Sequence, residues 1–87
     1  MVSNITKQVL ISEVKQFIID NFLFGSSLEI SDDDSFMNRG IIDSTGILEL
    51  IVHLETNYHI KIEDTELIPD NLDSLNNVAD FVMRKMA

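Results

Sequence analysis

The sequence predicts a small all-α bundle, with three main helices and one or two short helical turns before the last of them. Three segments repeat apolar residues at three- and four-residue spacing, which is typical of one helix face. No segment alternates apolar and polar residues for long enough to predict a convincing strand. The chain has 87 residues, 45% of them apolar, which is enough for one core and too few for two. We therefore expect residues 1–87 to form a single domain, as a monomer.

The first helix is expected from about Ser3 to Phe24. Ser3 or Asn4 can accept a backbone N–H at its start, and Gly25 with the two following serines can end it. Its apolar stripe comprises Leu10, Val14, Phe17, Ile18 and Phe22.

A long connection follows, over residues 25–43. A loop of this length in a small domain is usually functional or contains a short helical turn. We expect Ser35 to cap such a turn. Phe36 and Ile41 or Ile42 are expected to hold the connection against the core.

The second helix is the clearest and should run from Ser44 to about Tyr58. Two further apolar residues lie beside its stripe: Leu48 is expected to widen the buried face and Val52 to form an exposed contact patch. We expect Gly46, as a small residue, to keep the surface beside Ser44 open. The predicted stripe comprises Ile47, Leu50, Ile51, Leu54 and Tyr58.

The last third of the chain should contain an extended link, short turns and a final helix. Residues 60–62 form the link, residues 64–67 one helical turn, and Pro69 interrupts that turn or starts another. The final helix is expected from Ser74 to Lys85, capped by Asp73 or Ser74. Its predicted stripe comprises Leu75, Val78, Ala79, Val82 and Met86, with Phe81 at the flank.

Composition excludes several classes of function. The absence of cysteine excludes disulfides, a thiolate nucleophile and cysteine-based zinc sites. The net charge of −9 disfavours nucleic acid and anionic membranes, and the stretch 29–73 holds twelve acids against Arg39 and Lys61. This charge suits a solvated acidic surface or a docking surface for basic partners. No apolar run approaches a membrane span and the start does not read as a signal peptide, so we expect no membrane insertion and a cytoplasmic location.

Sites of metal binding and hydrolysis are also poorly matched. The aspartates at 32 and 34 are spaced as in a calcium loop, but Met37 and Asp43 replace the required glycine and glutamate, which favours a solvated loop. His53 and His59 are six residues apart, on different helical faces, and we expect no metal site. The nucleophile elbow of serine hydrolases lacks its leading glycine here.

One stretch remains, Gly40-Ile41-Ile42-Asp43-Ser44-Thr45-Gly46. Ser44 is expected at the positive start of the second helix, where serine is most often an ordinary N-cap and where a phosphate ester is also favoured. The stretch resembles the phosphopantetheine attachment region of acyl and peptidyl carrier proteins, in which an Asp-Ser-Leu motif opens the second helix of a four-helix bundle. Thr45 departs from the usual leucine. The upstream phenylalanine, Leu54-Glu55 and the link at 60–62 add to the resemblance.

The resemblance implies that Ser44 carries 4′-phosphopantetheine transferred from coenzyme A, with acyl groups held as thioesters on the arm's thiol. A second stretch, Asp73-Ser74-Leu75, matches the Asp-Ser-Leu motif better. It lacks the preceding glycine and aliphatic residues, and it opens the last helix instead of the second. We therefore expect Asp73 and Ser74 to be helix caps. Ser44→Ala separates a carrier, which loses all activity, from an all-α interaction module that is never modified.

The resemblance also implies what surrounds the arm. The chain itself is expected to be no enzyme, and its partners are a phosphopantetheinyl transferase, an adenylating ligase and acyl-transferring or condensing enzymes. Asp43 is expected beside the attachment point, and Glu49, Val52 and Glu55 on the docking face of the second helix. The cargo is expected to be an acyl group, with an aminoacyl or peptidyl group loaded by a stand-alone ligase as the alternative.

Overall fold

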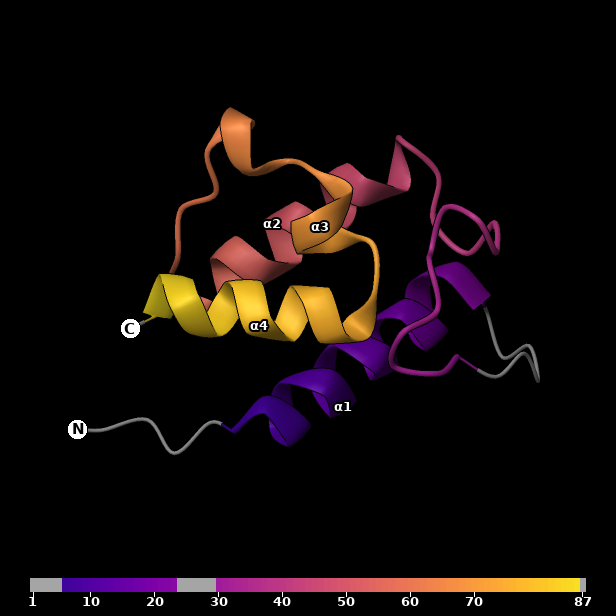
Figure 1. Cartoon of the computed structure of the whole chain (residues 1–87), viewed down its shortest axis with the longest axis horizontal. Coiled ribbons are helices and arrows are strands. Elements are labelled where there is room, and N and C mark those ends of the chain that lie inside the picture. Colours follow the sequence, from indigo (N-terminus) through magenta and orange to yellow (C-terminus); the bar gives the residue numbers. More distant parts are fainter. Residues whose placement is uncertain (1–5, 24–29, 87) are drawn as a thin grey trace.

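The structure, a computed structural model, describes residues 6–23 and 30–86, and these residues form four α-helices and no strand. The helices are α1 (Lys7–Ile18), α2 (Gly46–Tyr58), α3 (Pro69–Leu72) and α4 (Leu75–Met86). α1 and α4 pack against each other, α2 contacts α4, and the short α3 contacts α4 (Figure 1). The all-α fold with three main helices and a short third one is confirmed.

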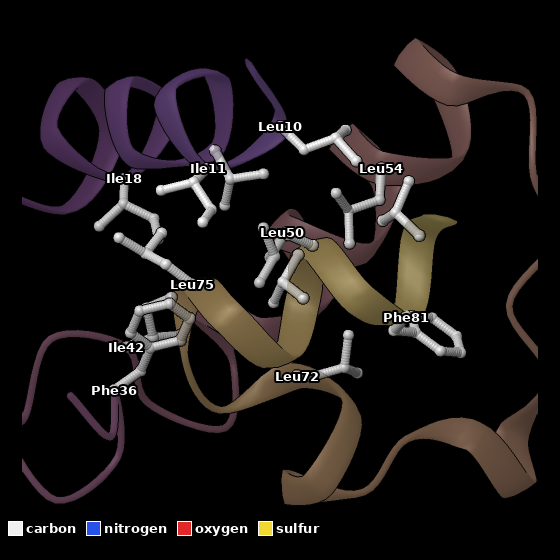
Figure 2. Close-up of a cluster of buried hydrophobic side chains, with 14 of the residues drawn as sticks. Leu10, Ile11, Ile18, Phe36, Ile42, Leu50, Leu54, Leu72, Leu75 and Phe81 are labelled. Atoms are coloured by element: carbon white, nitrogen blue, oxygen red, sulfur yellow. The ribbon is translucent and has the colours of Figure 1, made fainter. Parts of the chain in front are cut away.

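The core lies between α1, α2 and α4 and is closed at one end by the connection that precedes α2 (Figure 2). Phe36 and Ile42 from this connection are buried together with the helical side chains. Burying apolar surface is the main favourable contribution to folding, so the connection is part of the folded core rather than an appendage. The fully buried larger side chains are Phe36, Phe81, Leu10, Ile18, Ile42, Leu50, Leu54, Leu75, Val14, Val78 and Val82.

The first helix is shorter than predicted. The side chain of Thr6 caps α1, because its Oγ1 accepts a hydrogen bond from Val9 N at 3.2 Å. After Ile18 the chain continues as a π-helical turn, Ile19–Leu23, instead of completing the α-helix. The predicted caps at Ser3 and Asn4 and the predicted stop at residues 25–27 lie outside the described residues.

The apolar stripes of α2 and α4 are largely confirmed, and three positions were wrong. Leu48 does not widen the buried face of α2, since it is 57% exposed, whereas Val52 is exposed as predicted. Phe81 is not at a flank of α4 but is 2% exposed, on a helix that α3 also contacts. The buried stripe of α4 ends at Val82, because Met86 is 36% exposed. An apolar flank residue therefore cannot be assigned from its own helix alone.

The segment between α2 and α4 follows the prediction. Residues 59–63 contain no helix, a 3₁₀ turn spans Asp64–Glu66, and Pro69 is the first residue of α3. Lys85 Nζ on α4 binds Glu66 Oε1 at 2.9 Å and ties the turn to the bundle. Ser74 caps α4, since its Oγ accepts a hydrogen bond from Asn77 N at 3.1 Å. Within the described ranges, no helix has the length and apolar character needed to cross a membrane.

Candidate functional site

Ser44 lies in a turn immediately before the first residue of α2 and is exposed. No hydrogen bond joins its hydroxyl to another of the described residues. The turn continues into the helix through backbone bonds from Ile47 N to Asp43 O, at 3.0 Å, and from Leu48 N to Thr45 O, at 3.2 Å. Ser44 is therefore presented at a helix start without taking part in holding that start together.

Asp43, and not Ser44, caps the beginning of α2. Its Oδ1 accepts a hydrogen bond from Gly46 N at 2.7 Å. A carboxylate at this position satisfies a free N–H group and interacts favourably with the positive end of the helix dipole. The alternative interpretation of Ser44 as an ordinary N-cap therefore does not hold, because the preceding residue supplies the capping oxygen.

Gly46 provides close packing rather than an open surface, which corrects the prediction. It is buried, and a Cβ atom added there would lie 2.7 Å from Cε1 of Phe22 and 3.1 Å from Cγ2 of Ile42. It would also lie 3.2 Å from the capping oxygen of Asp43. The π-helical turn after α1 thus brings the Phe22 ring against the start of α2, at a place that only glycine leaves free.

The connection before Ser44 folds around Phe36. Its carbonyl accepts hydrogen bonds from Ile41 N at 2.8 Å and from Ile42 N at 3.4 Å. Gly40 closes this loop with a φ of 68°, a conformation that residues with a Cβ atom rarely adopt. The predicted roles are confirmed: Phe36, Ile41 and Ile42 are buried, and Ser35 caps the turn by accepting from Asn38 N at 3.1 Å.

A shallow pocket of about 170 Å³ adjoins Ser44. Apolar side chains from three segments form most of its wall, and Met37 and Ile68 are 53% and 45% exposed. The lining residues are Met37, Ser44, Ile47, Leu67, Ile68, Pro69, Leu72 and Asp73. Ser44 therefore lines an accessible, mostly apolar surface together with residues of α2 and α3.

The predicted docking residues of α2 differ in their surroundings. Glu49 is exposed and Val52 is 61% exposed, one turn from the exposed Leu48. Glu55 is half-buried, and its Oε2 accepts a hydrogen bond from Ile62 N at 2.9 Å, which fixes the link after α2. Glu49, Leu48 and Val52 together present an apolar strip with a negative charge beside it.

The two histidines have different environments. His53 stacks on Phe17, with ring centroids 4.0 Å apart, and Asn57 Nδ2 lies 3.0 Å from its Nδ1. Burial lowers the pKa of His53 below its usual value, and Glu13 acts in the opposite direction. His59 ends α2 in a left-handed conformation with a φ of 56° and is exposed. Among the described residues no group of acidic and histidine side chains could hold a metal ion.

The aspartates of the connection make defined contacts, although they were expected to form only a solvated loop. Asp34 accepts from Ser31 N at 2.9 Å and pairs with Arg39 at 2.5 Å, and the pKa of Asp34 is lowered by these partners. Asp33 Oδ1 accepts from Asn76 Nδ2 at 2.5 Å. These acids therefore organise the connection and fasten it to α4.

Sequence reasoning missed Asp73 and Asn76 as contacts of this region. Asp73 was assigned only a capping role, but its carboxylate contacts Ser35 and Met37, more than thirty residues earlier in the chain. Asn76 N donates to Asp32 O at 2.9 Å. No local pattern marks such pairs, because their partners are brought together only by the fold.

The local arrangement is suited to carrying an ester on Ser44. The hydroxyl is exposed, is not needed for the helix cap, and stands where the helix dipole favours an anion such as a phosphate. The neighbouring pocket offers apolar contact to a chain attached there.

Comparison with known proteins agrees with this geometry. Residues 23–82 match the sequence model of the family described as "Phosphopantetheine attachment site". The chain is 32% identical over 71 residues to the D-alanyl carrier protein of Streptococcus uberis, covering 79% of this chain and 90% of that protein. It is also 32% identical over 65 residues to the D-alanyl carrier protein of Streptococcus thermophilus, covering 75% of this chain and 81% of that protein.

The matched family fixes the general role of the chain. The family model indicates a covalently attached 4′-phosphopantetheine group, and carrier proteins hold substrates for transferases and ligases without catalysing the reactions themselves. The match spans the connection, α2, α3 and most of α4. This chain therefore belongs to the phosphopantetheine attachment family and is a carrier protein.

Proposed function

We propose that the chain carries an aminoacyl group as a thioester on a 4′-phosphopantetheine arm attached to Ser44. The observation that carries the attachment point is the exposed hydroxyl of Ser44 at the start of α2, with the cap supplied by Asp43 instead. A phosphate ester formed there gains from the helix dipole and removes no hydrogen bond of the described structure.

Ser74 is the competing serine, because it also follows an aspartate and precedes a leucine. Its side chain is unsuited to the role: the residue is 5% exposed and its Oγ accepts the bond that caps α4. Esterification at Ser74 would have to expose the residue and remove the cap, which costs about 0.5–2 kcal/mol. Both considerations favour Ser44.

The amino acid class of the cargo is supported by the relatives, which are named D-alanyl carrier proteins. The arm supplies a thiol that holds an acyl or aminoacyl group as a thioester. This chain supplies the presentation of the arm: the capped start of α2 fixes the direction of Ser44, and the pocket at Met37 and Ile68 provides apolar contact beside it. D-alanine is the first cargo to test.

The partners are proposed to dock on the exposed side of α2. Glu49 offers a charge that speeds encounter with a basic surface, and Leu48 and Val52 offer a small apolar contact. Such a surface suits brief association with several enzymes in turn: the phosphopantetheinyl transferase, an adenylating ligase and the enzyme that receives the cargo. We place these encounters in the cytoplasm.

The attachment is tested by intact mass after incubation with coenzyme A and a broad-specificity phosphopantetheinyl transferase. The wild-type chain should gain the mass of one phosphopantetheine, Ser44→Ala should gain none, and Ser74→Ala should be modified like wild type. Circular dichroism establishes that each variant is folded. A folded wild-type chain that several transferases leave unmodified would instead support an unmodified interaction module.

The cargo is tested on the modified protein with an ATP-dependent ligase that activates D-alanine, with L-alanine and a fatty acid as the compared substrates. A mass gain of one alanyl group that hydroxylamine removes is expected, because thioesters react with this nucleophile. A parallel reaction uses a ligase that activates the fatty acid. If that ligase loads the protein and the amino acid ligase does not, the chain is an acyl carrier, the other function that the sequence predicts.

A further inference from the structure

We propose that Asp73, at the junction of α3 and α4, is a positioning residue for the modification of Ser44. It acts through the connection that precedes Ser44 and does not need to touch the reacting atoms. The inference rests on Ser44 being the attachment point and goes further by naming what holds that point in place.

Asp73 binds the middle of the connection, residues 35–37, through three acceptor atoms. Its backbone oxygen accepts from Phe36 N at 2.8 Å, its Oδ1 accepts from Met37 N at 3.0 Å, and its Oδ2 accepts from the Ser35 hydroxyl. Hydrogen bonds to a carboxylate are stronger than those between neutral groups. Asp73 is half-buried, so solvent competes with these bonds less than at an open surface.

Hydrogen bonds through Phe36 connect the contacts of Asp73 to the segment that precedes Ser44. Phe36, which Asp73 holds by its N–H, accepts from Ile41 N and Ile42 N through its carbonyl. Ile42 directly precedes Asp43. The carboxylate and the carbonyl of Asp43 accept hydrogen bonds from Gly46 N and Ile47 N at the start of α2. Hydrogen bonds of the described structure therefore link Asp73 through Phe36 to Ile42, and the chain itself continues from Ile42 through the capping Asp43 to Ser44.

A second set of hydrogen bonds comes from Asn76, in the first turn of α4, and holds the same connection. Asn76 N donates to Asp32 O at 2.9 Å, and Asn76 Nδ2 donates to Asp33 Oδ1 at 2.5 Å. Asn76 and Asp73 thus hold the connection at two places, residues 32–33 and residues 35–37. Loss of the Asp73 side chain removes its bonds to Ser35 and Met37, on either side of Phe36, and keeps the backbone bond from Phe36 N. It should therefore loosen the loop around Phe36 while leaving the contacts of Asn76 in place.

The KM of the transferase for this chain should depend on the fraction of molecules in which the connection is ordered. If the transferase binds only chains in which Ser44 is correctly placed, its apparent affinity falls in proportion to the fraction in that state. We therefore expect Asp73→Ala to raise the KM of the transferase for this chain about tenfold and to leave kcat within about twofold. Asp73→Asn should restore most of the wild-type KM, because an amide retains one acceptor for Met37 N and one donor toward Ser35.

Two further variants separate positioning from stability. Ser35→Ala removes the bond to Asp73 from the side of the connection, together with the cap on Asn38 N, and should raise the KM at least as much as Asp73→Ala. Ser74→Ala removes the cap of α4 next door, which lowers stability without touching the connection. Its KM should therefore stay at the wild-type value, although the protein melts at a lower temperature.

The experiment measures transfer of phosphopantetheine from coenzyme A to the apo protein over a range of protein concentrations, together with amide hydrogen exchange. The Ile41 and Ile42 amides should exchange faster in Asp73→Ala than in Ser74→Ala. An unchanged KM and unchanged exchange in folded Asp73→Ala would overturn the positioning role while modification at Ser44 stands. Modification of Ser44→Ala would overturn the proposed attachment itself. The exchange rates of the Ile41 and Ile42 amides would still show whether Asp73 orders the connection.

Discussion

Gly46→Ala tests the close approach between the start of α2 and the π-helical turn. Two effects oppose each other. Alanine is favoured over glycine in a helix interior by about 1 kcal/mol, which is an upper bound at Gly46 because it is the first residue of α2. The new Cβ would lie 2.7 Å from the Phe22 ring, 3.1 Å from Ile42 and 3.2 Å from the capping oxygen of Asp43, and overpacking of this kind typically costs about 1–3 kcal/mol.

The contacts indicate that overpacking prevails. Ile42 is 2% exposed and has no free space to retreat into, and Asp43 Oδ1 is held by its bond to Gly46 N. The Phe22 ring is half-buried and packs edge-on against Phe17. We expect a net loss of about 1 kcal/mol in the free energy of unfolding, which for a domain of this size lowers the melting temperature by about 4–8 °C.

The assay is urea unfolding followed by circular dichroism at 222 nm. Thr56→Ala is the matched control, because Thr56 is an exposed residue of the same helix and alanine there should stabilise slightly. In the double variant Gly46→Ala with Phe22→Leu, the costs of the two changes should be less than additive, since the shorter side chain relieves the contact. A Gly46→Ala protein as stable as Thr56→Ala would refute the reasoning.

Three further outcomes are expected. Ser74→Ala should lower the free energy of unfolding by about 0.5–2 kcal/mol through loss of the α4 cap, measured by urea unfolding. Burial lowers the pKa of His53 below its usual value of 6.5, so the unfolded chain binds a proton first and stability should fall as the pH falls below 6.5 and through the lowered pKa of the folded chain. This component should vanish in His53→Gln and persist in His59→Asn, as seen in melting temperatures over that pH range. Glu49→Lys should slow cargo transfer to a cognate enzyme at low salt with an unchanged helical signal, whereas an equal rate would exclude docking at this residue.

The helical pattern of the sequence was enough to predict the fold, because residues such as Leu50 and Leu54 are spaced for one face and that face is the buried one. The turn at Ser35 and the burial of Phe36 were also predictable, from local chemistry and from the length of the connection. Local capping rules do not decide between two neighbouring residues that can both accept a hydrogen bond from the helix start. Asp43 and Ser44 can each cap a helix, and only the structure shows that the carboxylate does so.

Long-range contacts account for the remaining differences. Gly46 looked like a small residue left beside an open site, whereas its partner Phe22 lies more than twenty positions earlier. Asp73 looked like a helix cap, whereas its carboxylate reaches back to Ser35 and Met37. Leu48 looked like part of the core, and its exposure depends on which neighbouring helix covers it. None of these partners repeats with a local period, so a single sequence holds no signal for them.

The separation between the residue that caps α2 and the residue that carries the arm has a thermodynamic consequence. Because no bond of the described fold is made by the Ser44 hydroxyl, esterifying it breaks no contact of the folded chain. Only the folded chain has the helix dipole that favours the phosphate, by about 0.3–1 kcal/mol at an exposed site, so modification and folding are weakly coupled in favour of the arm-bearing form. The arm-bearing form should unfold at a slightly higher urea concentration than the apo form, and one pool of protein can pass through repeated rounds of loading and discharge without losing stability.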